Sequence, residues 1–305
     1  MERQVKPSVM EAIGNTPLVR LGRIFPDTDV AAKLEFMNPG GSIKDRMVRY
    51  MLTHLPPGTA HVVEGSSGNT GAALAMASAV LGLDCDIAVP GTTSGEKIKR
   101  IATYGAKVHV CADRGGAEEA PDYQAVAEEI ARRNDAFYLD QYCSELNREA
   151  HYTDTAPELW AQLNGELDVF VCGIGSGGTI SGIGRFLKER NPAIRVIGVE
   201  PVGSSYRHLV EKAPRDAVFA TAIEGIGKPQ PSHSFDPAVV DEVVQVSDDE
   251  ALSWVRRLAQ EEGILAGGSS GGVAAGIAQL LPRLHGARVV TIFPDSGMFY
   301  LSKYF

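Results

Sequence analysis

Short apolar runs rich in valine and isoleucine alternate along the chain with longer segments of helical period. The apolar runs predict strands at residues 29–36, 61–65, 84–90, 106–112, 136–142, 168–174, 195–200, 243–246 and 287–294. The segments between them predict helices at residues 69–82, 94–105, 122–134, 155–165, 180–191, 248–263 and 271–284. Apolar strands flanked by amphipathic helices are typical of a mostly parallel sheet that is covered on both faces. The pattern therefore predicts an α/β fold, with a long loop over residues 211–237.

Length, composition and charge exclude several classes of protein. The chain has 305 residues, of which 44% are hydrophobic, enough for one large or two modest cores. A net charge of -9 and the lack of any run of lysine and arginine argue against partners such as nucleic acid or an anionic membrane. The sequence contains neither an apolar signal core nor a stretch of about 18 apolar residues. We expect a cytoplasmic protein that acts on small molecules.

The cysteines and histidines give no sign of a metal centre. The four cysteines are widely scattered without a CxxC pair, and the seven histidines show no HxxxH spacing. Free thiols and no metal site are therefore expected.

Three polar, glycine-rich loops each precede a predicted helix. They are EGSSGNTG at residues 64–71, GIGSGGT at 173–179 and AGGSSGG at 266–272. In an open α/β sheet such loops lie at the carboxyl ends of the strands, where ligands bind. Because backbone N–H groups at helix N-termini bind phosphate and carboxylate, the loops predict an anionic ligand.

The second loop also fits a dinucleotide fingerprint. Gly173, Gly175 and Gly178 match GxGxxG, and Glu200 ends the next predicted strand, as a nicotinamide or flavin site requires. A dinucleotide-binding oxidoreductase is one alternative, and glycines that only let a helix pack closely are another.

Lys44 is placed unusually for a lysine. It follows a Gly-Gly-Ser turn in the stretch NPGGSIKDR, residues 38–46, at the point where a loop becomes a helix. A fixed lysine that can bind a carbonyl compound as a Schiff base, together with a loop of N–H donors for a phosphate, is the minimal requirement for pyridoxal phosphate. The sequence therefore predicts pyridoxal 5'-phosphate as the cofactor.

The motifs NPGGSIKDR, GSSGNTG, GIGSGGTISG, EGIG, AGGSSGG and FPDSG, with IGNTPLVRL at the start, give the chain a family likeness. Their order and spacing resemble the pyridoxal-phosphate enzymes of the cysteine synthase and cystathionine β-synthase family. The resemblance implies an open parallel-sheet α/β fold of the tryptophan synthase β-like type, PLP fold type II. It also implies a homodimer and two lobes, a smaller one at residues 37–145 and a larger one at 1–36 and 146–305, with the cofactor between them.

The resemblance assigns roles to individual residues. Lys44 would form the Schiff base and carry the Cα proton, Asn69 would bind the ring hydroxyl, and Ser269 would face the pyridine nitrogen. The cofactor phosphate would be bound by Gly175, Ser176, Gly177, Gly178 and Thr179. The substrate would be bound by Ser66, Ser67, Asn69, Thr70, Gln141 and Gly225.

The reaction implied by the family is β-replacement on an activated L-serine, O-acetylserine or O-phosphoserine, through an aminoacrylate intermediate. The stretch DQYCSELNREAHY, residues 140–152, carries Glu-Leu-Asn where sulfhydrylases commonly have Asn-Pro. It resembles the enzymes that join O-phosphoserine to glutamate, the N-(2-amino-2-carboxyethyl)-L-glutamate synthases of 2,3-diaminopropionate and siderophore biosynthesis. A serine/threonine dehydratase and a catalytically silent binding protein are further alternatives. A phosphoserine donor would need a cation, for which Lys228, Arg207 and Arg100 are candidates.

Overall fold

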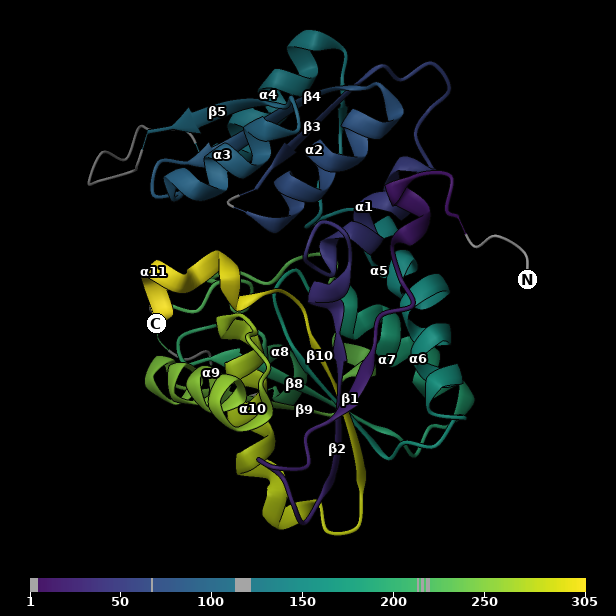
Figure 1. Ribbon diagram of the computed structural model, residues 1–305, viewed down its shortest axis with the longest axis vertical. Coiled ribbons are helices and arrows are strands. Elements are labelled where there is room, and N and C mark those ends of the chain that lie inside the picture. Colours follow the sequence, from purple (N-terminus) through teal and green to yellow (C-terminus); the bar gives the residue numbers. More distant parts are fainter. Residues whose placement is uncertain (1–4, 67, 113–121, 213, 215–216, 218–219) are drawn as a thin grey trace. The chain divides into compact units, whose positions relative to one another are not determined.

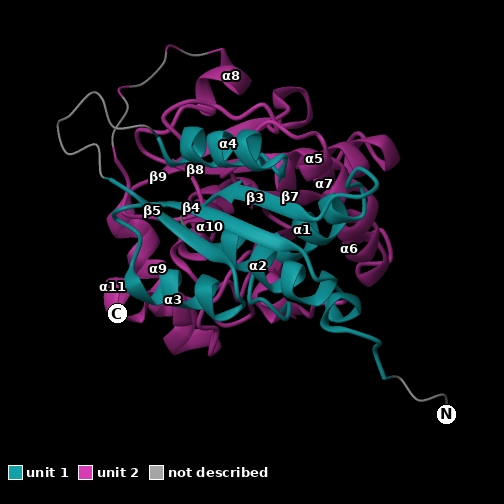
Figure 2. Cartoon of the chain, turned by 90° about the horizontal axis from the view of Figure 1, so that it is seen from above, with its two compact units in different colours: residues 1–14, 38–141 teal, residues 15–37, 142–305 magenta. Residues whose placement is uncertain are grey.

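The computed structural model describes residues 5–66, 68–112, 122–212, 214, 217 and 220–305. The chain divides into two compact units (Figures 1 and 2). Unit 1 comprises Met1–Gly14 and Asn38–Gln141, and unit 2 comprises Asn15–Met37 and Tyr142–Phe305. The division into lobes at residues 37 and 145 stays a prediction.

Unit 1 contains a four-stranded parallel sheet with the order β5-β4-β3-β6. Its strands are β3 (His61–Gly65), β4 (Asp84–Pro90), β5 (Lys107–Cys111) and β6 (Phe137–Tyr138). Its helices are η1 (Val9–Ala12), α1 (Lys44–Leu52), α2 (Asn69–Leu81), α3 (Gly95–Thr103) and α4 (Tyr123–Asn134). The strands alternate in sequence with the helices, which is why the neighbouring strands are parallel.

Helices cover both faces of this sheet (Figure 2). Helix α4 covers one face, where Val63, Ala88 and Ala127 form a buried cluster. Helix α2 lies on the other face, so close that a Cβ on Gly71 would meet the Ile87 side chain at 2.8 Å. This close packing fixes the first turn of α2 against the sheet.

Unit 2 contains a six-stranded sheet with the order β1-β2-β10-β7-β8-β9. Only β1 is antiparallel to its neighbour among the described strands. The strands are β1 (Leu18–Arg20), β2 (Asp29–Leu34), β7 (Val169–Gly173), β8 (Arg195–Pro201), β9 (Glu242–Val246) and β10 (Arg288–Phe293). The principal helices are α5 (Leu146–Ala150), the π-helix η3 (His151–Thr155), α6 (Ala156–Gln162), α7 (Gly178–Arg190), α8 (Arg207–Glu211), α9 (Asp248–Glu262), α10 (Gly268–Leu280) and α11 (Leu301–Tyr304). Short turns complete the unit at η2 (Glu35–Met37), η4 (Pro237–Val239), η5 (Leu281–Arg283) and η6 (Gly297–Tyr300).

Helices α9 and α10 lie on one side of this sheet and α6 and α7 on the other (Figure 1). Helix α10 is apolar on all sides and buried along most of its length. A Cβ on Gly276 would meet Val199 of β8 at 2.8 Å, so α10 contacts the sheet directly. The continuous apolar core beneath α10 fixes the position of its first turn.

The predicted α/β class is confirmed. The predicted strands and helices are found, and most of their ends differ from the predicted ends by a few residues. The prediction missed β1, which has only three residues, and the short helices α5, α8 and α11. The loop AGGSSGG was expected to follow a strand, but Ala266 makes only an isolated bridge with Ser296. The long loop predicted at residues 211–237 begins at the last residue of α8, and part of it lies outside the described residues. In the part of the chain that the structure describes, no helix is both long enough and apolar enough to cross a membrane.

Candidate active site

Lys44 is the first residue of α1 and follows a turn with a fixed backbone. Gly41 has φ 80°, a conformation that favours glycine, and its N–H donates to the Asn38 carbonyl at 2.8 Å. The N–H of Gly40 donates to the Asp45 carboxylate at 2.6 Å. Because Asp45 directly follows the lysine and is buried, this bond fixes the lysine at the start of the helix.

Arg100 connects this turn to Asn69. The Arg100 guanidinium donates to the Asn69 side-chain oxygen at 3.3 Å and to the Gly40 carbonyl. The Asn69 amide is therefore oriented with its oxygen toward Arg100. Arg100, a candidate cation for a phosphoserine donor, thus contacts the predicted cofactor residues of unit 1.

The predicted substrate residues of unit 1 converge on Gln141. The Thr70 hydroxyl donates to the Gln141 side-chain oxygen at 2.8 Å, although the two residues are 71 positions apart. Ser66 and Thr70 are buried, and the Ser66 side chain accepts a bond from the N–H of Gly68 at 3.3 Å. Ser67 was also predicted here but lies outside the described residues.

The Gln141 amide also donates to Glu64 at 3.2 Å. Glu64 is completely buried, and burial raises the pKa of its carboxyl group to about 8. The hydrogen bond from Gln141 and the nearby charge of Lys44 lower this pKa only in part. Sequence reasoning did not assign a role to Glu64, although a glutamate inside an apolar strand was visible in HVVEG.

In unit 2, the predicted phosphate loop forms the turn between β7 and α7. Gly177 is the N-cap of α7 with φ 86°, and Gly178 is its first residue. A Cβ on Gly177 would meet Phe235 at 2.5 Å, so this backbone can be adopted only by glycine. The first N–H groups of a helix have no partner within the helix, and they stand here beside the hydroxyls of Ser176 and Thr179. This set of donors contains no carboxylate and fits a phosphate.

Two side chains from the α5–η3 segment support this loop. The Asn147 amide donates to the Ser176 hydroxyl oxygen at 3.0 Å. The ring of His151, which is buried, makes a 3.2 Å hydrogen bond with Thr179. His151 therefore supports the loop structurally. Asn147, the last residue of the Glu-Leu-Asn stretch, connects that stretch to the loop.

A third support is Tyr206, which sequence reasoning missed. Its hydroxyl donates to the Gly175 carbonyl at 2.5 Å, and its ring packs edge-on against Phe235. Tyr206 is held in turn by Glu200, whose carboxylate accepts from the N–H of Tyr206 at 2.9 Å and of Arg207 at 3.2 Å. Glu200 thus binds backbone N–H groups of its own unit. This is the acidic residue that suggested a dinucleotide site, and the hydrogen bonds give it a structural role.

Ser269, Gly225 and Gly175 lie together in unit 2. Ser269 is in the first turn of α10 and is buried. A Cβ on Gly225 would lie 3.8 Å from the Ser269 hydroxyl oxygen. Gly175 is packed so closely against the Gly225 carbonyl that a side chain at Gly175 would collide with it. A buried hydroxyl at this position fits a polar ring atom of a cofactor.

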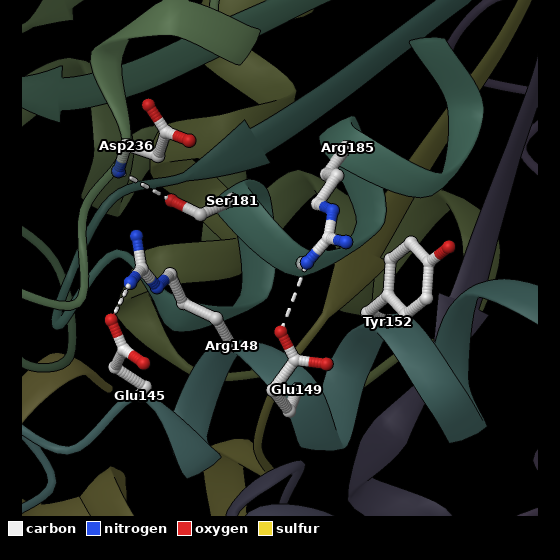
Figure 3. A pocket seen from close by; sticks show the side chains of 8 residues that line it. Glu145, Arg148, Glu149, Tyr152, Ser181, Arg185 and Asp236 are labelled. Carbon is white, nitrogen blue, oxygen red and sulfur yellow. Dashed lines mark hydrogen bonds and ion pairs between the residues drawn. The ribbon is translucent and has the colours of Figure 1, made fainter. Parts of the chain in front are cut away.

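A separate polar cavity of about 330 Å³ lies on the outer side of the α5–η3 segment (Figure 3). Its charged side chains already pair with one another, Glu145 with Arg148 at 3.1 Å and Glu149 with Arg185 at 3.0 Å. None of the predicted site residues lines it. The cavity is therefore not the predicted active site.

The fold and these two groups of residues define an α/β protein with a glycine-rich loop at a helix N-terminus and a lysine at a fixed turn. A family model for pyridoxal-phosphate dependent enzymes matches residues 9–295. The chain belongs to this family.

Several similar proteins are synthases. Cysteine synthase B of Pseudomonas aeruginosa is 37% identical over 305 residues, which cover 97% of this chain and 96% of that protein. The N-(2-amino-2-carboxyethyl)-L-glutamate synthase of Cupriavidus metallidurans is 39% identical over 96% of this chain and 88% of its own length. Cystathionine beta-synthase of Apis mellifera is 38% identical over 99% of this chain, which spans only 62% of that enzyme. The crystal structure of an O-ureido-L-serine synthase has a TM-score of 0.89 and 33% identity, covering 98% of this chain and 95% of that one.

These matches confirm the family resemblance, the fold of PLP fold type II and the pyridoxal-phosphate cofactor predicted from the sequence. The protein is a pyridoxal-phosphate dependent enzyme that performs β-replacement on small molecules. The reading as a dinucleotide-binding oxidoreductase is not supported by any of them.

Proposed function

We propose that this enzyme replaces the β-substituent of an activated L-serine, either O-acetyl-L-serine or O-phospho-L-serine. The observation that carries the proposal is the hydrogen bond from Thr70 to Gln141. It places a hydroxyl and an amide side by side and orients the Gln141 N–H groups, neutral donors that can bind an amino-acid carboxylate without an arginine clamp. Such binding fits a small amino acid whose chemistry occurs at Cβ.

Each predicted cofactor residue has a distinct task in this proposal. When bound, pyridoxal phosphate supplies the electron sink that stabilises negative charge at the substrate Cα. Lys44 holds the cofactor covalently and then moves the Cα proton, because its amine is fixed beside the reacting carbon. Asn69 binds the ring hydroxyl, and Ser269 faces the pyridine nitrogen with a hydroxyl in place of a carboxylate. The phosphate is bound by Gly175, Ser176, Gly177, Gly178 and Thr179.

The substrate carboxylate is bound by Ser66, Ser67, Thr70 and Gln141, with Asn69 and Gly225 beside the substrate. Ser66 and Gln141 are nearly inaccessible to water, which strengthens hydrogen bonds to an anion. The buried setting therefore supports binding of the carboxylate by neutral groups.

The three candidate cations for a phosphoserine donor have different surroundings. Arg207 pairs with Glu211 at 2.8 Å, and Arg100 is bonded to Asn69 and Gly40. Lys228 is half-buried and lies over the Tyr142 ring at 3.9 Å, four residues after Glu224 in the EGIG turn. Because Lys228 follows Gly225 closely, it is the cation that we assign to the leaving group.

The test uses the loaded enzyme with each donor in turn. A change in visible absorption on adding O-acetylserine or O-phosphoserine identifies the donor. Sulfide, homocysteine and glutamate are then added separately, and the products are identified by mass spectrometry against cysteine, cystathionine and N-(2-amino-2-carboxyethyl)-L-glutamate. No absorption change with either donor would overturn the proposal.

A second candidate is N-(2-amino-2-carboxyethyl)-L-glutamate synthesis from O-phosphoserine and glutamate. The Glu-Leu-Asn stretch at residues 145–147 and the 39% identity to the Cupriavidus metallidurans enzyme favour it. Product formation with glutamate, and not with sulfide or homocysteine, would select it. Release of pyruvate from serine without an added nucleophile would instead select a dehydratase.

We further propose that the enzyme is a cytoplasmic homodimer whose smaller lobe spans residues 37–145, with residues 1–36 and 146–305 in the larger one. Light scattering of the purified protein tests the dimer. A monomeric mass at micromolar concentration would contradict it.

A further inference from the structure

Glu64 is a buried acidic side chain to which the proposed reaction assigns no role. It is the residue before the last one of β3, and none of its surface is exposed. One carboxyl oxygen accepts a hydrogen bond from the Gln141 amide at 3.2 Å. The other oxygen has no hydrogen-bond partner among the residues that the structure describes. A carboxylate in this position would be costly, since burial disfavours the charged form.

The hydrogen bonds around Gln141 run in one direction. Thr70 donates to the amide oxygen at 2.8 Å, and the amide nitrogen donates to Glu64. Glu64 and Thr70 contact the two ends of the Gln141 amide and hold this side chain between them.

We propose that Glu64 is a positioning residue: as a neutral carboxylic acid it orients Gln141 to bind the substrate carboxylate, and its ionisation weakens the binding of amino-acid substrates. The inference rests on the proposed function, because there Gln141 binds the carboxylate. An ionised Glu64 would put a negative charge directly behind the group that receives another negative charge, in a site with little water to screen it.

The surroundings of Glu64 keep it neutral near pH 7. The residue paired with Glu64 on the neighbouring strand β4 is the apolar Ile87. Helix α2 carries no charged residue. Lys44 of α1 lowers the pKa of Glu64, whereas Asp140 raises it. Tyr138 of β6 is also close, and Glu64 in turn raises the pKa of this tyrosine. Burial outweighs these charges, so that the pKa of Glu64 is about 8.

The first experiment measures amino-acid binding as a function of pH in the loaded wild-type enzyme and in Glu64→Gln. L-alanine is the probe, because it has the carboxylate but no leaving group, and binding is followed by the visible absorption of the cofactor. A group that must stay protonated, with a pKa of about 8, raises the dissociation constant roughly tenfold at pH 9. We expect this rise in the wild type relative to Glu64→Gln, whose amide cannot ionise. L-alaninamide, which lacks the carboxylate, should show no such difference between the two proteins.

The second experiment does not depend on catalysis. The folded protein keeps the Glu64 proton between about pH 4.5 and 8, whereas the unfolded chain has released it, so the free energy of unfolding of the wild type falls as pH rises through this window. In urea unfolding, Glu64→Gln should lose this decline. Should alanine cause no spectral change at any pH, the proposed function fails, while the unfolding data still decide whether Glu64 is neutral.

Three results would overturn the inference. They are an equal pH dependence of alanine binding in both proteins, equal pH dependence of their unfolding, or a weaker turnover in Glu64→Gln with an unchanged pH profile. If Glu64→Gln does not fold, infrared titration of the wild type replaces it. A protonated carboxyl band that persists up to about pH 8 supports the inference, and its loss by pH 6 overturns it.

Discussion

The Arg100 guanidinium binds the side-chain oxygen of Asn69 at 3.3 Å. The same guanidinium binds the carbonyl of Gly40, in the turn that precedes Lys44. One cation thus fixes both the residue that we assign to the cofactor ring hydroxyl and the turn that carries the Schiff-base lysine. Arg100, which the sequence suggested as a cation for a substrate phosphate, therefore contacts Asn69 and the turn before Lys44.

Replacing Arg100 by methionine should weaken cofactor binding. Hydrogen bonds with a charged donor contribute about 1.5–3 kcal/mol each, so losing them should raise the dissociation constant of pyridoxal phosphate at least about tenfold. Absorbance titration of the apoenzyme measures this constant. The exposed Arg132, which pairs with Glu129 on α4, provides the matched control Arg132→Met. Equal affinity in the two variants would remove the role of Arg100.

Lys44→Ala should abolish turnover and covalent retention of the cofactor. After borohydride reduction, mass spectrometry should find the cofactor on the peptide containing Lys44 in the wild type and on no peptide in the variant. Lys99→Ala changes an exposed lysine of helix α3 in the same unit and should behave as the wild type. Substantial turnover by Lys44→Ala would refute the assignment.

Thr70→Val tests the substrate carboxylate residues. The valine keeps the shape of threonine but cannot donate to the Gln141 oxygen, and a buried acceptor without a partner costs about 1–3 kcal/mol. We expect KM for the amino-acid donor to rise about tenfold or more, with a smaller effect on cofactor affinity. Thr53→Val, at an exposed threonine of the same unit, is the control. A rise in KM of equal size in both variants would show that the Thr70 bond is not specific to the substrate.

The sequence predicted the parts of this site that depend on short, local patterns. Glycines beside Ser176, and a lysine after a Gly-Gly-Ser turn, can be found because the backbone needs them at fixed spacing. The supporting roles of Tyr206, Asn147 and Arg100 could not be found in this way. Each contacts its target through tertiary packing across 29 or more positions of sequence, and each belongs to a residue type that occurs on any surface. The three-residue strand β1 was missed because it is too short to show a period.

Gly178→Ala should damage the phosphate loop. A Cβ at this position would collide with the Asn147 side chain, which is held by Ser176. Moving Asn147 disturbs the loop, and overpacking of this kind costs about 1–3 kcal/mol. We expect weaker binding of pyridoxal phosphate and a lower free energy of unfolding, by fluorescence titration and urea unfolding respectively. Gly95→Ala, also in the first turn of a helix but with no atom within 4 Å of the new Cβ, should change neither. A Gly178→Ala enzyme with unaltered affinity would show that the loop does not bind the phosphate.

Lys228→Met should separate the two donors. Its ammonium group lies 3.9 Å from the centre of the Tyr142 ring, in a cation–π contact. A phosphate dianion gains more from a nearby cation than a neutral acetyl group does. KM for O-phosphoserine should therefore rise about tenfold or more, from the loss of one charged hydrogen bond, while KM for O-acetylserine changes little. Lys188→Met, at a lysine paired with Asp241 in the same unit, controls for the loss of one positive charge. If KM rises equally for both donors, Lys228 supports the EGIG turn and does not recognise the leaving group.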